Sequence, residues 1–348
     1  MSSFPQFFDS PMRAALAGKR PVQTPVWFMR QAGRSLPEYR RARQNTTMLE
    51  ACTIPDLAAE ITLQPVIRHD VDAAVFFSDI VVPLYLAGVD IDILPGRGPV
   101  LASPIRAVED ITRLTALEVE DWSVIETAAA QVRRELAFEK VLMGFAGAPF
   151  TLASYLIEAD TTDKLQRRQC RQTKAFIEAN PAAWNSLATW CARLSGLFMK
   201  AQIAGGAEAV QLFDSWAGSL TVEEYRRYAL PYSNLAFQVA KGAAHVHFAA
   251  GAGHLLPAMG EIAEIVSVSN DVTLGAAAKQ LGHKPLQGNL DPEVLLEGID
   301  AAWKSAEEVL AAGRSAPSHI FNLGHGVLPQ TDPGVLTELT ARIHAWRA

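Results

Sequence analysis

The stretch that decides the fold is KVLMGFAGAPFTLASYLI, residues 140–157. It begins with a short apolar run over residues 140–146, typical of a buried strand, and passes through a Gly-Ala-Pro turn into a helix-like segment. Its apolar part, residues 143–157, is too short and too rich in glycine and proline to span a membrane. A strand, a turn and a helix in this order form one unit of an α/β protein.

Similar units recur along the chain, because amphipathic segments such as 54–69, 184–206 and 291–313 separate short runs rich in β-branched or aromatic residues. The runs predicted as strands are 25–29, 72–78, 140–146, 207–213, 244–249, 264–269, 284–290 and 319–324. Strands that alternate with helices pair in parallel through right-handed crossovers. Eight such units, with no linker between them, predict a single (β/α)8 TIM barrel over residues 1–348. A doubly wound sheet is the alternative.

Composition narrows the class of protein. The 348 residues are 49% hydrophobic and 20% charged, with a net charge of -6, which disfavours general nucleic-acid binding. The three cysteines, Cys52, Cys170 and Cys191, have no paired spacing, so neither a disulfide framework nor a zinc ribbon is expected. The first residues, MSSFPQFFDSPMRAAL, lack the apolar run of a signal peptide. We therefore expect a cytoplasmic protein without a membrane segment.

The barrel prediction also places the chemistry, since active sites of this fold lie where strands end and βα loops begin. Polar or glycine-rich residues follow the predicted strands one after another. They are Arg30, Asp79, the turn at 147–149, Asp214, Ser215, Gly251, Asn289 and His325.

The first of these positions opens an arginine-rich segment, WFMRQAGRSLPEYRRAR, residues 27–43. Gly33 and Pro37 argue against one continuous helix, so we expect a loop over 30–36 and a helix that begins at Pro37. Arginine suits bidentate recognition of carboxylate or phosphate, which predicts an anion site. The alternative is an exposed helix face on which Glu38 pairs with Arg34 or Arg41.

Other polar residues have a functional and a structural interpretation each. Asp79 lies between two apolar segments, so it is either a buried functional carboxylate or a loop cap. His325 has a glycine on each side, which allows close backbone approach, although most single histidines are structural. Tyr155 suits a helix packed on a strand, and Ser215 lacks the G-x-S-x-G surroundings of a nucleophile elbow.

Metal and nucleotide sites find little support. His245 and His247 point to the same face of one strand, but no third ligand stands at a telling spacing. The glycines of GFAGAPF lack the Lys-Ser/Thr of a phosphate loop, and no G-x-G-x-x-G follows the first strand. The residues themselves predict a cofactor-free barrel enzyme for a small, multiply anionic molecule, and do not identify that molecule.

The extended motif PVWFMRQAGRSLPEYR, residues 25–40, closely resembles the N-terminal signature of the uroporphyrinogen decarboxylase family. GFAGAPFTLASYLIE, residues 144–158, is similar to the family's second signature. The resemblance continues through EITLQP (60–65), DAAVFFSDI (72–80), QLFDSWAG (211–218), LQGNLDP (286–292) and FNLGHGVLP (321–329). It covers nearly the whole chain.

The resemblance implies a (β/α)8 barrel that forms a homodimer with its two clefts facing. The implied reaction removes the carboxyl groups of the four acetate arms of uroporphyrinogen III. The product is coproporphyrinogen III, an intermediate of tetrapyrrole (haem and chlorophyll) biosynthesis, and no cofactor takes part.

The resemblance also assigns residues by motif. The expected substrate-binding residues are Phe28, Arg30, Gln31, Ala32, Arg34, Arg43, Asp79, Tyr155, Phe213, Ser215 and His325. Among them the arginines bind substrate carboxylates, and the Asp79 carboxylate accepts the pyrrole N–H groups. The expected catalytic residues are Asp79, Arg30, Tyr155 and His325. The proton donor stays open between Arg30, Tyr155, His325 and water.

Three positions depart from the family pattern. Ser35 stands where a tyrosine is common, Ala250 where a lysine is common, and Ser269-Asn270 where an Asp-Trp pair is frequent. Two rival functions remain, a cobamide-dependent methyltransferase and a non-enzymatic tetrapyrrole-binding module. The methyltransferases bind zinc through a His-x-Cys motif, whereas this chain has His247-Phe248-Ala249 at that place.

Overall fold

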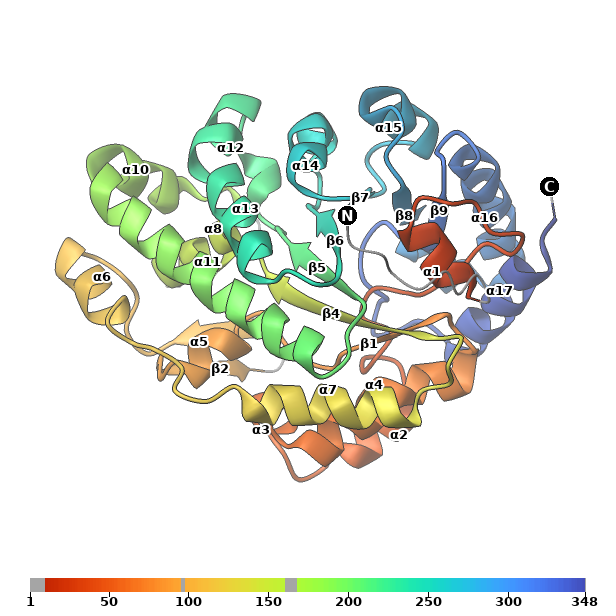
Figure 1. Ribbon diagram of the computed structural model, residues 1–348, viewed down its shortest axis with the longest axis horizontal. Coiled ribbons are helices and arrows are strands. Elements are labelled where there is room, and N and C mark those ends of the chain that lie inside the picture. The colour runs from red at the N-terminus through yellow and green to blue at the C-terminus, as the bar shows by residue number, and fades with distance from the viewer. Residues whose placement is uncertain (1–9, 95–97, 160–167, 348) are drawn as a thin grey trace.

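The computed structural model describes residues 10–94, 98–159 and 168–347. Its central feature is a curled sheet of seven parallel strands in the order β1-β4-β5-β6-β7-β8-β9 (Figure 1). The strands are β1 (Ala73–Val75), β4 (Val141–Gly147), β5 (Ala209–Phe213), β6 (Ala244–Phe248), β7 (Ile265–Ser267), β8 (Leu286–Leu290) and β9 (His319–Leu323).

The order of the strands decides between the two predicted architectures. Each strand pairs with the next one of this sheet along the chain; β4, for example, pairs with β5 from Met143↔Ala209 to Gly147↔Phe213. A doubly wound sheet reverses its order at a switch point. No reversal occurs among these seven strands, so the doubly wound alternative is wrong and the predicted α/β class with parallel pairing is confirmed.

The first predicted strand, residues 25–29, forms only a single parallel bridge, Val26↔Phe321. On one side Phe321 N donates to Pro25 O at 2.8 Å and Trp27 N donates to Phe321 O at 3.2 Å. On the other side Asp72 N donates to Val26 O at 2.8 Å. The segment therefore lies between β9 and the start of β1, but the assigned sheet has seven strands and is not closed. The predicted closed eight-stranded barrel is correct only in part.

Helices surround this sheet (Figure 1). The α-helices are α1 (Pro11–Leu16), α2 (Pro37–Ala42), α3 (Met48–Thr53), α4 (Pro55–His69), α5 (Val82–Leu86), α6 (Val108–Leu114), α7 (Ser123–Glu135), α8 (Pro149–Ile157), α10 (Arg171–Ala179), α11 (Pro181–Ala204), α12 (Val222–Tyr228), α13 (Leu230–Val239), α14 (Leu256–Ile262), α15 (Leu274–Leu281), α16 (Ile299–Gly313) and α17 (Pro333–Ala345). Short 3₁₀ helices are η1 (Ala217–Ser219), η2 (Gly253–Leu255) and η3 (Pro292–Glu297).

Local sequence explains where these helices begin and end. Proline occupies the first turn of α4, where its missing N–H costs nothing, and Asp70 ends the helix in a left-handed conformation with φ 53°. The predicted helices 54–69 and 184–206 correspond to α4 and α11. The predicted helix 291–313 is instead broken at Gly298, whose φ of 97° separates η3 from α16.

One element was not predicted, an antiparallel pair formed by β2 (Ile91–Leu94) and β3 (Gly98–Leu101). Its register runs from Ile91↔Leu101 to Leu94↔Gly98. The two strands have only four residues each, and the burial of β2 does not follow a clean alternation. Such short runs carry too little periodicity to be found in a sequence.

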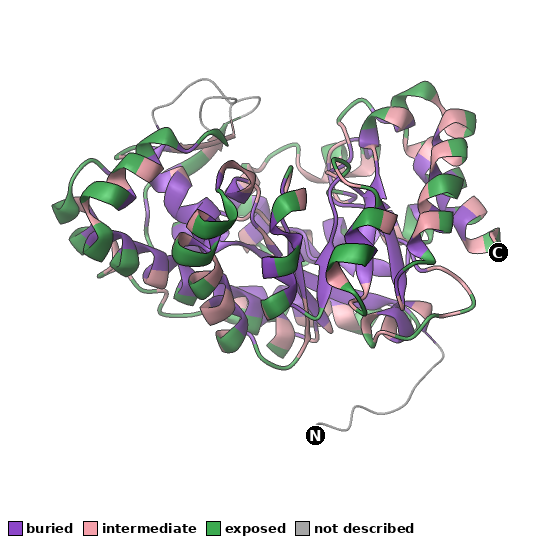
Figure 2. Cartoon of the chain, turned by 90° about the horizontal axis from the view of Figure 1, so that it is seen from above, coloured by how far each residue is buried: buried purple, intermediate pink, exposed green. Residues whose placement is uncertain are grey.

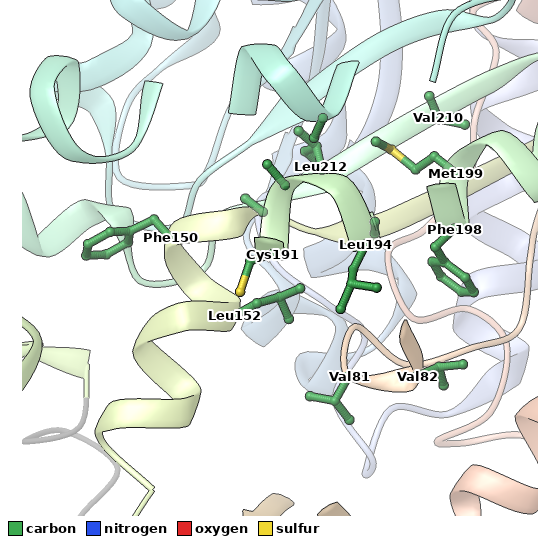
Figure 3. Close-up of a cluster of buried hydrophobic side chains, with 14 of the residues drawn as sticks. Val81, Val82, Phe150, Leu152, Cys191, Leu194, Phe198, Met199, Val210 and Leu212 are labelled. Atoms are coloured by element: carbon green, nitrogen blue, oxygen red, sulfur yellow. The ribbon is translucent and has the colours of Figure 1, made fainter. Parts of the chain in front are cut away.

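The core lies on both faces of the sheet. Every residue of β4 is buried, as expected for a parallel strand covered by helices on one face and by facing strands on the other. Figure 2 places the buried residues along the strands and the exposed ones on the outer helices. In Figure 3, Leu194 and Phe198 of α11 pack near Leu152 of α8 and Val82 of α5. Each such side chain contributes roughly 1.5–3 kcal/mol when fully buried.

Two sequence expectations concern the remaining chemistry of the chain. Cys52, Cys170 and Cys191 are buried and free, which confirms that they form no disulfide. Within the described ranges, no helix combines the length and apolar character needed to cross a membrane.

Candidate active site

A cavity of about 350 Å³ lies at the carboxyl ends of the strands. Its lining residues follow β5, β6, β7 and β9, with Arg168 at the rim. Those used below are Ser215, Trp216, Ala250, Gly251, Asp271 and His325. Segments far apart in the sequence therefore meet at one edge of the sheet, as the strand-end pattern predicted.

His325 follows β9 and is half-buried in this cavity. Burial and the neighbouring charges of Arg30, Arg168 and Arg34 lower the pKa of His325 to about 4. The ring is therefore neutral at neutral pH. Its Nδ1 accepts the backbone N–H of Gly326 at 2.8 Å, which places the ring proton on Nε2. His325 consequently acts as a hydrogen-bond donor through Nε2.

The loop over 30–36 has an unusual backbone. Arg30 has φ 64° and Arg34 has φ 39°, a left-handed region that non-glycine residues seldom occupy. Two such residues in one loop need support from their surroundings, and strain of this kind gathers at functional sites. Two hydrogen bonds fix Met29, the residue directly before this loop. Met29 N donates to Asn322 Oδ1 at 2.9 Å, and Val327 N donates to Met29 O at 2.8 Å.

The glycine after His325 makes room for the Arg30 side chain. A Cβ at Gly326 would stand 2.5 Å from Arg30 Cδ and 2.8 Å from Cγ, which no real side chain tolerates. The stem of Arg30 therefore lies directly on the backbone of the β9 loop. This contact brings Arg30 beside His325, in agreement with the effect of Arg30 on the pKa of the imidazole.

Arg30 and Arg34 differ in their partners from the arginines that form ion pairs on the surface. Arg13 pairs with Glu208 at 2.6 Å and Arg68 pairs with Glu38 at 2.5 Å. In the described part of the chain, no hydrogen bond or ion pair joins Arg30 or Arg34 to a carboxylate. Burial and the like charge of Arg30 lower the pKa of Arg34 to about 10, so Arg34 remains charged at neutral pH. Two neighbouring guanidinium groups of this kind suit bidentate recognition of an anion.

Asp79 follows β1 and supplies a half-buried carboxylate to the same region. Its Oδ1 accepts the Val81 N–H at 3.1 Å. Burial raises the pKa of Asp79, while the backbone N–H of Val81 and the charge of Arg30 oppose that shift. One carboxylate oxygen of Asp79 thus caps the loop that follows β1, as one of the two interpretations predicted. The effect of Arg30 on the pKa of Asp79 links the same carboxylate to the loop over 30–36.

Tyr155 of α8 lies on the opposite side, against the loop that follows β5. Its ring stacks on Trp216 with centroids 4.1 Å apart and an interplanar angle of 28°. Trp216 and Ser215 both line the cavity. Ser215 and His325 therefore line the cavity directly, and Tyr155 lies next to it behind the stacked Trp216.

Arg43 differs from Arg30 and Arg34 in having side-chain hydrogen-bond partners, and its partner Tyr39 also interacts electrostatically with Arg34. It is the residue after α2, and its Nη1 donates to Tyr39 Oη at 2.5 Å and to Met48 Sδ at 3.1 Å. The predicted helix from Pro37 is confirmed as α2, and residues 30–36 are a loop, as expected. The predicted pairing of Glu38 with Arg34 or Arg41 is wrong, because Glu38 accepts both of its bonds from Arg68.

The remaining predicted contact residues, Phe28, Gln31, Ala32 and Phe213, are not among the residues that line the cavity. Gln31 is buried and joins two segments, since its Oε1 accepts Phe28 N at 2.9 Å and its Nε2 donates to Ala73 O at 2.8 Å. Phe28 is fully buried, and Ala32 packs on the core. Phe213 makes edge-to-face contacts with Phe145 and Phe248.

The cavity residues that the sequence analysis missed include Arg168, Trp216 and Asp271. Trp216 stood inside the quoted QLFDSWAG motif, and Asp271 directly follows the unusual Ser269-Asn270 pair, so both had a signal. No sequence pattern pointed to Arg168, because it lies in a charged segment of the kind that is usually exposed to solvent. Asp271 is held in place by the Ser269 hydroxyl and by Gly253 N at 3.2 Å.

The two histidines considered for a metal face a helix instead of the cavity. His245 stacks on Phe237 of α13 at 4.5 Å, and His247 meets the same ring edge-on at 5.8 Å. They do share one face of β6, as predicted. Among the described residues, no group of three or more His, Cys, Asp or Glu side chains is arranged to hold a metal ion.

Comparison with known proteins agrees with these features. Residues 8–346 match the family described as Uroporphyrinogen decarboxylase (URO-D). Proteins named uroporphyrinogen decarboxylase from Saccharopolyspora erythraea and Streptomyces coelicolor are 48% and 49% identical, each over 97% of this chain and 95% and 94% of their own. A solved methyltransferase from Methanosarcina mazei has the same fold, with a TM-score of 0.76, 19% identity and coverage of 97% and 98%. The chain belongs to the uroporphyrinogen decarboxylase family.

Proposed function

We propose that this protein decarboxylates uroporphyrinogen III, removing its four acetate carboxyl groups to give coproporphyrinogen III and carbon dioxide. The observation that carries the proposal is the pair of neighbouring arginines, Arg30 and Arg34, with the half-buried carboxylate of Asp79 coupled to Arg30. The substrate has eight carboxylates and four pyrrole N–H groups, so it needs both kinds of partner. The names of relatives about 48% identical over nearly the whole chain support the same reaction.

The reaction needs an electron sink, because loss of carbon dioxide leaves an electron pair on the former acetate carbon. A pyrrole protonated on a ring carbon accepts that pair, since it has become an iminium-like cation. Decarboxylation thus leaves a neutral ring with an exocyclic double bond. A second proton adds to the exocyclic carbon, which becomes a methyl group, and the ring carbon releases the first proton, which restores the pyrrole. The substrate itself therefore supplies the sink, and the enzyme must hold the substrate, stabilise positive charge and deliver protons.

The site offers groups that can hold the substrate and groups that can stabilise positive charge. Arg30 and Arg34 bind carboxylates that remain while another is lost, and their forked geometry suits two parallel bonds. Asp79 accepts pyrrole N–H bonds and, when ionised, stabilises the cationic ring. Tyr155, Ser215 and His325 form the wall that faces the macrocycle.

Proton delivery falls to Arg30, Tyr155 or a water molecule. His325 takes a different role, because its pKa of about 4 leaves no imidazolium at neutral pH. A neutral ring with the proton on Nε2 donates a hydrogen bond to a carboxylate without giving the proton away. Arg43, bonded to Tyr39, anchors the arginine segment and reaches an outer carboxylate of the substrate.

The same proposal covers the architecture. Residues 25–29 serve as the eighth strand, because their main-chain bonds reach β9 on one side and Asp72 on the other. The chain is then one closed barrel and a single domain. Two copies form a homodimer with facing clefts, which light scattering of the pure protein tests.

The decisive experiment incubates the pure protein with uroporphyrinogen III under reducing conditions and separates the products by carboxyl number. Heptacarboxyl to tetracarboxyl products are expected in sequence. Tight binding of the substrate without any product would instead identify a tetrapyrrole-binding module.

A parallel assay after exhaustive chelation addresses the methyltransferase alternative. Activity is expected to survive, since the described residues offer no metal-binding group. Loss of activity with EDTA and recovery with zinc would favour the alternative, which the likeness to the Methanosarcina mazei protein supports in fold only.

A further inference from the structure

The carboxyl group of Asp214 is not used by the mechanism above. It follows β5, is fully buried, and stands directly before Ser215 and Trp216 of the cavity wall. A buried carboxyl group costs more free energy than an apolar side chain of the same size unless donors compensate it. Its place beneath the site argues for a role beyond packing.

One hydroxyl compensates this carboxyl group and also reaches the wall. Thr151 Oγ1, from α8, donates to Asp214 Oδ1 at 2.7 Å. The same oxygen accepts the backbone N–H of Trp216 at 3.3 Å. Asp214, Thr151 and the main chain of Trp216 thus form a continuous chain of hydrogen bonds.

These hydrogen bonds help to position one aromatic pair, Trp216 and Tyr155. Thr151 and Tyr155 are four residues apart on α8, so they lie on one face of the helix. Trp216, held by Thr151, stacks on Tyr155 at 4.1 Å. The loop itself is fixed at its base, because Asp214 N donates to Phe248 O at 2.7 Å and Ala217 N donates to Asp214 O at 3.2 Å.

We infer that Asp214 is a positioning residue, which fixes the Thr151 hydroxyl so that the Trp216–Tyr155 pair presents a rigid wall to the macrocycle. The second carboxyl oxygen agrees with this role. Asp214 Oδ2 is buried and has no hydrogen-bond partner among the described residues, so the group meets Thr151 through one oxygen only. The inference rests on the proposed function, because the wall matters only to a bound tetrapyrrole.

The position of the pair predicts which kinetic constant changes. Among the described residues, no hydrogen bond or ion pair joins Arg30 or Arg34 to Asp214 or Thr151. Removing the Thr151–Asp214 bond should leave substrate binding nearly intact and misplace the ring that faces the reacting arm. A displacement of about 1 Å costs up to about 100-fold in rate. We therefore expect kcat to fall about 10- to 100-fold, with KM changed less than about threefold.

The test uses five variants of the full chain with uroporphyrinogen III. Thr151→Val and Asp214→Ala both lose the bond and should show the kcat loss, and the double variant should be no slower than either single one. Asp214→Asn keeps an oxygen that accepts from Thr151, so it should recover most of the activity. Thr340→Val is the matched control, because this buried hydroxyl donates to Leu336 O at 2.9 Å within α17, outside the cavity.

The outcomes separate a positioning role from a structural one. A purely structural role would lower the melting temperature of Thr151→Val and of the control alike, with the kcat of the folded protein unchanged, and would overturn the inference. Asp214→Asn as slow as Asp214→Ala would also overturn it. An inert wild-type chain overturns the proposed function and this inference together, whereas an active wild type with normal variants overturns this inference alone.

Discussion

The two walls of the site differ in whether their polar and charged groups already have partners within the protein. The arginine wall, formed by Arg30 and Arg34, gathers guanidinium groups that no carboxylate of the described residues pairs with through a hydrogen bond or ion pair. Both residues stand in a left-handed backbone conformation. The opposite wall, which follows β5 to β7, consists of small or polar residues such as Ala250, Gly251 and Ser269. Its polar groups bond within the wall: Gly251 N donates to Ser269 Oγ at 3.1 Å, and Asn289 Nδ2 donates to Ser269 O at 3.0 Å.

This difference indicates which task each wall performs. A wall of uncompensated charge gains free energy only when a ligand supplies the opposite charge, so it should dominate binding and charge stabilisation. A wall whose polar groups are already satisfied gains little from new bonds, so it should act through shape. Substitutions of the charged groups on the first wall are expected to have large effects, and substitutions of lining residues such as Ala250 on the second wall small ones. The Thr151–Asp214 bond is a separate case, because it sets the shape of the second wall.

Asp79→Asn should give the largest loss. The amide keeps the shape but removes the negative charge that stabilises a cationic pyrrole, and it turns an N–H donor toward the pyrrole N–H groups. We expect turnover of uroporphyrinogen III to fall at least about 100-fold, the scale of removing one preorganised electrostatic group. The discrimination between reduced and oxidised macrocycle should weaken too, because the planar oxidised ring offers fewer N–H donors. Unchanged turnover and discrimination would reduce Asp79 to a loop cap.

Arg34→Lys should follow, with a loss of about 30-fold in kcat/KM. The change keeps the charge but replaces a planar fork by a point charge, which cannot form two parallel bonds to one carboxylate. Arg68→Lys is a matched control, because that arginine already pairs with Glu38 on the surface. Steady-state kinetics of both variants check the prediction. Equal, small losses would mean that Arg34 is an ordinary surface residue.

The pH dependence should report the ionisation of Asp79. Burial raises the pKa of this carboxyl group, and the ionised form is the active one. Activity is therefore present above the raised pKa and lost as the pH falls through it, by about tenfold per pH unit below that value. The loss should begin at a higher pH than for a solvated aspartate, whose pKa is about 3.9. The measurement is log kcat/KM against pH, and Asp79→Asn should lack this limb. A similar limb in Asp79→Asn would assign it to another group.

Gly326→Ala should reduce kcat/KM about fivefold through Arg30. The added Cβ would collide with the Arg30 stem at 2.5 Å, so the guanidinium group must move away from His325. Gly275→Ala on α15 is the control, because nothing lies within 4 Å of a Cβ there. Raised KM with nearly unchanged kcat is the expected pattern. Normal kinetics in Gly326→Ala would show that the Arg30 position is not set by this contact.

Much of the fold was visible in the sequence because its signals are local. Apolar runs bounded by turns located seven of the strands, and Pro55 together with the periodicity marked α4. The strand-end rule then collected Arg30, Asp79, Ser215 and His325 without any knowledge of distances. Residues 25–29 show the limit of local signals, since a bridge of one residue pair depends on the position of Phe321 almost 300 residues away.

What could not be predicted is the pairing of charges across long separations. Glu38 accepts from Arg68 and not from its neighbours on the same helix, because α4 brings Arg68 alongside α2. Asp214 was predicted only as a residue at the end of a strand, because its partner is also distant in the sequence. Its bond to Thr151 joins the ends of two neighbouring strands, and no spacing in the sequence encodes it.

The smallest effect is expected on the second wall, for Ala250→Lys, which restores the residue common in the family. Ala250 lines the cavity beside Gly251. A lysine there would face Asp271, whose carboxylate is already bonded to the Ser269 hydroxyl and to Gly253 N. The new charge therefore adds to a wall that is already satisfied, and turnover should change less than about twofold. Ser269→Asp alone should be slower, because a second carboxylate then lies beside Asp271, and adding Ala250→Lys should relieve that repulsion. Product analysis of the three variants beside the natural protein checks this order. An inert natural protein that becomes active with the restored lysine would contradict it and would identify the chain as a repurposed member of the family.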